Sequence, residues 1–153
     1  MNWIWDCITN PLLITAVSSW AIAQVIKVII HAWIYKKFDF GRLFGDGGMP
    51  SGHSATVVSL ALISGLIYGM GSFQFAVTAI LAIIVCHDAT GVRQETGKQA
   101  VVINELVRAF EALTTDDLPE TKLKEFVGHT PIQVLAGSLL GVLNAVGMYF
   151  LLV

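Results

Sequence analysis

Apolar stretches separated by two short basic windows constrain this chain more than any other feature of its sequence. Eight of the nine lysines and arginines fall within residues 36–50 and 87–128. The ninth, Lys27, lies inside an apolar stretch. Because a bilayer crossing needs about 20 apolar residues, the sequence predicts four membrane spans, at residues 11–35, 54–70, 73–89 and 131–153.

The composition also indicates a membrane protein. Hydrophobic residues make up 55% of the 153 residues and charged residues 13%, which is about half the usual charged fraction. A soluble domain of this size could not bury so much apolar surface, which argues against disorder and against an ordinary soluble enzyme. The net charge of −2 argues against nucleic acid as a partner. We predict an all-α integral membrane bundle that forms one domain over residues 1–153.

The basic windows predict the orientation of this bundle. Positively charged loops tend to stay on the cytoplasmic side of a membrane. We therefore place the loops 36–53 and 90–130 in the cytoplasm and both termini outside. Within the second loop, apolar residues at helical spacing predict a cytoplasmic amphipathic helix over residues 98–113, on the membrane surface or against the bundle. A short second helix is predicted over 120–127.

The first motif, Gly-Gly-Met-Pro-Ser-Gly-His-Ser-Ala, occupies residues 47–55, where the first loop meets the second span. We expect the amides of Ser51, Gly52 and His53 to lie at a helix N-terminus, which favours an anion. A histidine held there can donate a proton to a leaving oxygen. The alternative is a Gly/Pro turn with a serine cap, which explains the glycines and the serine but not His53.

The second motif, Gly-His-Thr-Pro at 128–131, occupies the mirror position, where the second loop meets the fourth span. We expect His53 and His129 to face each other across one pocket. One imidazole can then attack a phosphorus atom while the other protonates the departing oxygen. The alternative is that His129 only caps its helix.

A third motif at the end of the third span contains His87, Asp88 and Arg93. Asp88 can orient a histidine and Arg93 can bind a phosphate through two hydrogen bonds. Equally, Asp88 and Arg93 can form an interfacial ion pair. No pair among the histidines and Asp88 has the close spacing of a zinc motif, so we predict neither a metal nor a cofactor.

Lys27 needs an explanation because a charged group in hydrocarbon is costly. Gln24, Lys27 and His31 have the spacing of residues on one helix face. Two explanations remain open. Either the long side chain of Lys27 reaches the membrane interface, or this face lines the bundle interior and Lys27 provides positive charge to an anion site.

Together these motifs resemble the type 2 phosphatidic acid phosphatase superfamily, which also contains the vanadium haloperoxidases. Pro-Ser-Gly-His at 50–53 is similar to its central signature. The wider pattern resembles its small divergent membrane branch, known as acid phosphatase/vanadium-dependent haloperoxidase-related. The resemblance covers residues 20–142 and includes Gly97, Gln99 and Asn104.

The resemblance implies a role for each motif residue. It implies that His53 is the general acid and that Ser51 and the Gly52 amide bind phosphate. His129 is implied to be the nucleophile that becomes phosphohistidine.

The chain departs from the superfamily at three places. Gln133 and Leu123 stand where the superfamily has an aspartate and an arginine around the nucleophile, and the first superfamily motif is absent. Asp88 or Glu125 is then expected to orient His129. The expected phosphate-binding cations are Lys27, Arg42 and Arg93.

We therefore expect a membrane lipid phosphatase that acts at the cytoplasmic face through a phosphohistidine. Its expected substrate is a terminal phosphate monoester such as phosphatidylglycerophosphate, phosphatidic acid or a polyprenyl phosphate. One alternative is a non-catalytic lipid-phosphate binder or transporter with a degenerate pocket. Another is a structural subunit assembled through Gly137 and Gly141. We also expect a homo-oligomer, because four helices make a thin wall around a site.

Overall fold

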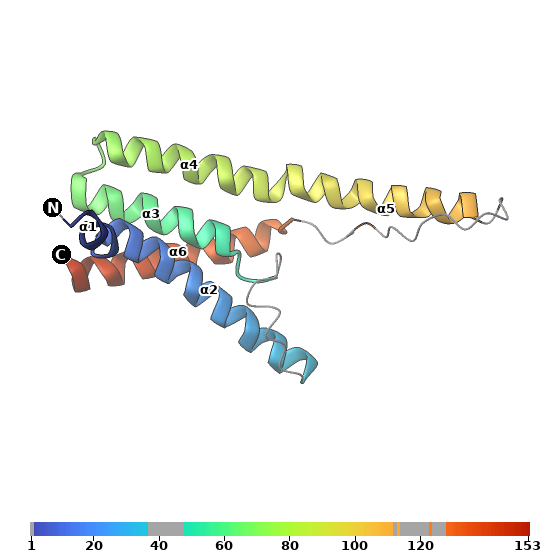
Figure 1. Ribbon diagram of the computed structural model, residues 1–153, viewed down its shortest axis with the longest axis horizontal. Coiled ribbons are helices and arrows are strands. Elements are labelled where there is room, and N and C mark those ends of the chain that lie inside the picture. Colours follow the sequence, from blue (N-terminus) through green and yellow to red (C-terminus); the bar gives the residue numbers. More distant parts are fainter. Residues whose placement is uncertain (1, 37–47, 112, 114–122, 124–127) are drawn as a thin grey trace.

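The structure, a computed structural model, describes residues 2–36, 48–111, 113, 123 and 128–153. Within these residues the chain is an all-α bundle, as predicted, and both termini lie at the same end of it (Figure 1). The predicted helix at 120–127 lies outside the described residues, apart from Leu123. The helices are α1 Trp3–Ile8, α2 Pro11–Tyr35, α3 Gly52–Tyr68, α4 Phe73–Thr90, α5 Val92–Glu111 and α6 Pro131–Leu152.

Side-chain caps set where the long helices begin. Asn10 Oδ1 accepts a hydrogen bond from Leu12 N at 2.9 Å, and Pro11 follows as the first residue of α2. Ser72 caps α4 in the same way. Proline suits the first turn because the amide that it lacks has no partner inside the helix. These caps place each helix start at a position that the local sequence specifies.

The bundle is organised around α3, which packs against α2, α4 and α6. The contact between α3 and α6 is close because α6 carries glycines on this side. A Cβ on Gly141 would lie 2.6 Å from the carbonyl oxygen of Ala55, and a Cβ on Gly137 would overlap the carbonyl oxygen of Ser51. Small residues allow such an approach between helices in membranes.

The packing of Gly137 and Gly141 against α3 contradicts one expectation from the sequence. Both glycines are buried against α3 of the same chain, so they are not available to assemble one subunit with another. The homo-oligomer itself stays a prediction, without support from this motif.

Small and polar side chains fill the interior, while large apolar side chains cover the outside. Ser19, Ser54, Ser59 and Ser64 are fully buried, and Ile63 is the largest side chain with no exposure among the described residues. In contrast, leucines, isoleucines, valines and aromatic residues are exposed along α2, α4 and α6. In water such a surface would drive aggregation. In lipid it is the expected arrangement, because tight packing of small residues and polar contacts hold membrane helices together.

Among the described residues, three helical segments are long and apolar enough to cross a membrane: Pro11–Tyr35, Phe73–Phe110 and Pro131–Leu152. The central helix α3 is shorter, with 17 residues, or roughly 26 Å at 1.5 Å per residue. It begins at Gly52, two residues before the predicted span, because Ser51 is its cap.

Helix α5 differs in its start and its direction from the amphipathic helix predicted over residues 98–113. It begins at Val92 rather than Lys98 and follows α4 after one intervening residue, Gly91. Figure 1 shows α5 continuing nearly in line with α4, beyond the end of the other helices. It therefore does not lie across the end of the bundle, since a single glycine did not redirect the chain.

Candidate functional site

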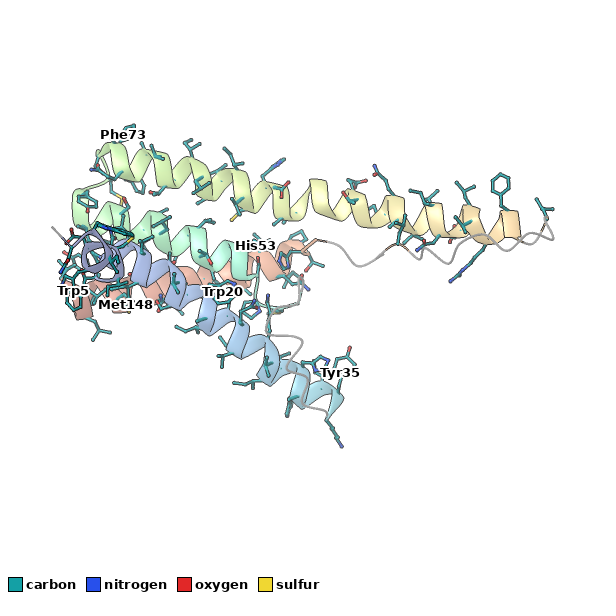
Figure 2. The ribbon with its side chains drawn as sticks, in the orientation of Figure 1. Trp5, Trp20, Tyr35, His53, Phe73 and Met148 are labelled. Carbon is teal, nitrogen blue, oxygen red and sulfur yellow. The ribbon has the colours of Figure 1, made fainter. Side chains whose placement is uncertain are left out.

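His53 is positioned by the start of α3. Ser51 caps this helix, and its Oγ accepts hydrogen bonds from Ser54 N at 3.3 Å and from Ser54 Oγ at 3.1 Å. His53 is then the second residue of the helix, and its side chain is half-buried. Figure 2 shows it at the end of the bundle opposite Trp5, Phe73 and Met148.

His129 is positioned by the start of α6. Gly128 has a φ of +94°, a conformation that favours glycine, and turns the chain toward the helix. The amide of His129 donates to the carbonyl oxygen of Ala89 at 3.0 Å, which fastens this residue to the last turn of α4. The His129 side chain is buried, with 3% exposure.

The structure brings these two histidines together. Their ring centroids lie 5.7 Å apart, with the ring planes inclined at 60°. A backbone hydrogen bond from Ser51 N to Gln133 O, 2.9 Å long, ties the start of α3 to the first turn of α6. Two histidines that are 76 positions apart in the chain, one at the start of α3 and one just before α6, therefore present their imidazoles to each other.

Gln133 holds one nitrogen of His129. Its Oε1 accepts a hydrogen bond from Thr130 N at 3.1 Å, which identifies that atom as the amide oxygen because a backbone N–H can only donate. His129 Nδ1 lies 3.3 Å from the same oxygen. Since this oxygen only accepts, Nδ1 must carry the proton. The lone pair of the neutral ring then lies on Nε2.

Lys27 lies inside the bundle. Its side chain is 8% exposed. Its Nζ lies 3.7 Å from the position that a Cβ on Gly52 would occupy, and its Cγ and Cδ lie 3.9 Å from the corresponding position at Gly48. The ammonium group is therefore beside the first residue of α3. Of the two explanations for this lysine, the structure favours the one in which it faces the interior.

Positive electrostatic potential gathers at the start of α3. The N-terminal end of a helix carries roughly half a positive charge, and the amide of Gly52, as the first residue of α3, has no acceptor within the helix. Lys27 adds a full charge at the same place. Trp20 Cδ1 lies 3.5 Å from the Cβ position of Gly52, so a larger residue there would contact the Trp20 ring. This end of α3 is suited to bind an anion.

Comparison with known proteins gives the family. A family model described as the Divergent PAP2 family matches residues 8–144. The chain belongs to the Divergent PAP2 family. The uncharacterized membrane protein YuiD of Bacillus subtilis (strain 168) is 42% identical over 147 residues, which cover 90% of this chain and 93% of that protein. No solved structure matches the chain.

One expectation for this Divergent PAP2 protein needs correction. The amide of Ser51 donates to Gln133 O and so is not available to an anion, although its hydroxyl keeps a proton to donate. Asp88, expected to orient His129, lies half-buried in the last turn of α4. Gln133 contacts His129 Nδ1, and the orienting role of Asp88 stays a prediction.

The remaining predicted site residues are placed only in part. Arg93 lies in the first turn of α5, whereas Arg42 and Glu125 lie outside the described residues. Within the part of the chain that is described, no three His, Cys, Asp or Glu side chains gather as a metal-binding group would require. The sequence analysis gave Gln133 no role, because this neutral residue stands where the superfamily has an aspartate. Its i+4 spacing and its capping-box pattern with Thr130 were the available signals.

Proposed function

We propose that this protein is a membrane phosphatase that removes the terminal phosphate from a lipid phosphate monoester through a phosphohistidine intermediate. The observation that carries the proposal is the pair of imidazoles, His53 and His129, with ring centroids 5.7 Å apart. The buried ammonium of Lys27 beside the start of α3 supports it, as does the membership of the Divergent PAP2 family.

In the first step, the lone pair of His129 Nε2 attacks phosphorus, and the bond between phosphorus and the lipid oxygen breaks. Protonated His53 donates its proton to that oxygen, so the lipid leaves as an alcohol. The hydrogen bond from Nδ1 to Gln133 holds the ring in the tautomer that this attack needs. His129 then carries the phosphoryl group.

In the second step, water attacks the phosphorus of the phosphohistidine. His53, now neutral, accepts a proton from this water, and the bond between phosphorus and Nε2 breaks. Inorganic phosphate leaves, and both histidines return to their starting states. One residue thus serves as acid in the first step and as base in the second.

Lys27 and the start of α3 stabilise the charge on the phosphate oxygens during both steps. Groups that are already oriented toward developing charge need no rearrangement when the reaction occurs, and a site that excludes water strengthens their effect. Phosphoryl transfer depends mainly on such positioning and electrostatic stabilisation. The burial of Lys27, at 8% exposure, is consistent with this requirement.

A lipid substrate is favoured by the position of the site. His53 is the second residue of a helix of 17 residues, roughly 26 Å long, whereas the hydrocarbon layer is about 30 Å thick. The start of α3 then lies near headgroup depth, where a lipid phosphate can bind while its acyl chains stay in the bilayer. The basic residues at this end include Lys36, the C-cap of α2, and Lys98 and Arg108 in α5. By the positive-inside tendency, this end of the bundle faces the cytoplasm.

One observation favours a second candidate, a non-catalytic lipid-phosphate binder or transporter. Gln133 is neutral, whereas a carboxylate at this position would stabilise the positive charge that His129 acquires on attack. A binder needs the anion site but does not need a carboxylate to stabilise positive charge on His129. It predicts that lipid phosphate binds without release of phosphate and that binding survives removal of either histidine.

The test is phosphate release by purified protein in detergent, without added divalent metal, from phosphatidylglycerophosphate, phosphatidic acid and a polyprenyl phosphate. We expect release from at least one lipid, and a loss of at least about 100-fold in His129→Ala and in His53→Ala. Radiolabel from the substrate phosphate should remain on wild-type protein after alkaline quenching and be absent from His129→Ala.

His87→Ala is the matched control, because His87 is exposed near the end of α4 and we assign it no chemical role. It should release phosphate at the wild-type rate. Release at the wild-type rate by folded His129→Ala would reject the phosphohistidine mechanism. Saturable lipid-phosphate binding with no release from any of the three lipids would establish the binder instead.

A further inference from the structure

Gln24 is a buried polar side chain with an unmet hydrogen-bonding requirement. It lies on α2 with 7% exposure, and its Oε1 has no hydrogen-bond partner among the residues that the structure describes. Buried polar atoms in proteins nearly always have a partner, supplied by the protein, by water or by a ligand. Within the described part of the chain, no neighbour donates a hydrogen bond to this oxygen.

The position of Gln24 is next to the start of α3. Trp20 and Lys27, on the same helix, both lie against Gly52, with Trp20 Cδ1 at 3.5 Å and Lys27 Nζ at 3.7 Å from its Cβ position. Gln24 lies four residues after Trp20 and three residues before Lys27, so the three share one helix face. Gln24 therefore belongs to the face of α2 that contacts the start of α3.

The chemistry of the unpaired atom restricts what it can bind. A phosphate monoester carries about −1.5 to −2 charges at neutral pH and presents mainly acceptor oxygens. The ammonium of Lys27 and the amide of Gly52 are donors and match these oxygens. The fully ionised phosphate has no proton to donate, so Gln24 Oε1, an acceptor, needs a donor from another part of the substrate. In a phosphate ester that donor is a hydroxyl group on the alcohol portion.

We infer that Gln24 selects lipid phosphates whose headgroup carries a free hydroxyl close to the phosphate ester. This inference rests on the proposed function and narrows its substrate class. In phosphatidylglycerophosphate, the glycerol unit that bears the terminal phosphate has a free hydroxyl on the neighbouring carbon. Phosphatidic acid and polyprenyl phosphates have none. A site that is built to hydrogen-bond a hydroxyl discriminates strongly against an analogue that lacks it.

The first experiment compares kcat/KM for dioleoyl phosphatidylglycerophosphate and dioleoyl phosphatidic acid in mixed detergent micelles. We expect wild-type protein to prefer the hydroxylated lipid at least tenfold. Gln24→Leu and Gln24→Met, which remove the acceptor, should lower kcat/KM for this lipid at least tenfold and leave the value for phosphatidic acid within about threefold. Two different replacements are used so that a packing defect in one variant is not mistaken for the loss of the acceptor.

The matched control is Gln74→Leu, the same change at an exposed position near the start of α4. It should keep the wild-type preference. Equal rates on both lipids in wild-type protein, or an equal loss on both lipids in the folded Gln24 variants, would overturn the inference while leaving the proposed phosphatase intact.

A binding experiment separates failure of the inference from failure of the proposed function. Thermal unfolding of His129→Ala is measured with each of the two dioleoyl lipids and does not depend on turnover. We expect phosphatidylglycerophosphate to raise the Tm more than phosphatidic acid, and Gln24→Leu in this background to remove the difference. If wild-type protein releases no phosphate but this difference is present, the phosphatase is rejected and the selectivity stands. No difference in Tm would reject the selectivity.

Discussion

His129 Nδ1 lies 3.3 Å from Gln133 Oε1, which also accepts a hydrogen bond from Thr130 N at 3.1 Å. Gln133 thus completes the capping box that begins α6 and at the same time orients the imidazole one turn before it. The i to i+4 spacing brings the two side chains to one face of the chain. A neutral side chain therefore provides orientation at this position without adding charge.

Gln133→Leu should lower kcat by about 10- to 100-fold, because the ring of His129 loses the acceptor that holds its tautomer. The change also removes the cap on α6, at a cost of roughly 1 kcal/mol in the free energy of unfolding. Thr130→Ala removes the cap but keeps the contact to Nδ1, and so serves as the control. Phosphate release and thermal unfolding are measured for both variants. Equal losses of kcat would mean that Gln133 acts only on helix stability.

His53→Ala should lose less activity on a substrate with a good leaving group than on a lipid. An aryl phosphate leaves as a stabilised anion and needs little protonation, whereas a lipid alkoxide needs the proton that His53 donates. The measurement is the ratio of wild-type to variant kcat/KM for an aryl phosphate and for the preferred lipid. A general acid is excluded if this ratio is the same for both.

Lys27→Met should raise KM for the lipid phosphate by about tenfold or more, because it removes the positive charge beside Gly52 while keeping an unbranched side chain. Thermal unfolding of this variant is measured in parallel, so that a loss of stability is distinguished from a loss of phosphate binding. Lys36→Met, at the exposed C-cap of α2, is the control. An unchanged KM and unchanged phosphate affinity in Lys27→Met would remove this lysine from the site.

Gly141→Val should destabilise the protein by about 1–3 kcal/mol, because its Cβ would approach the Ala55 carbonyl oxygen to 2.6 Å and force α6 away from α3. Gly147→Val, further along the same helix, is the control because no atom of the described residues lies within 4 Å of its Cβ position. Thermal unfolding in detergent is compared for the two variants. A similar Tm in both would show that close contact between α3 and α6 is not required.

The pairing of the histidines illustrates what the sequence was able to predict. His53 and His129 each stand at the start of an apolar helix and next to a loop on the same side, and the structure places their rings together. The prediction was possible because hydrophobic stretches and helix caps are local signals that fix depth along the bundle. The start of α5 was missed because the predicted helix was placed by its apolar spacing, which begins only after the polar residues that form the first turns of α5.

The sequence by itself determined the helical class, the apolar stretches and the helix caps, because each depends on neighbouring residues. Only the tertiary structure decided that Gly137 and Gly141 pack against α3, that Lys27 lies beside Gly52, and that Gln24 is left with an unpaired oxygen. These facts depend on how far each helix is rotated about its axis and on which partner it meets. Rotation and partner follow from packing among segments far apart in the chain, so no local pattern specifies them.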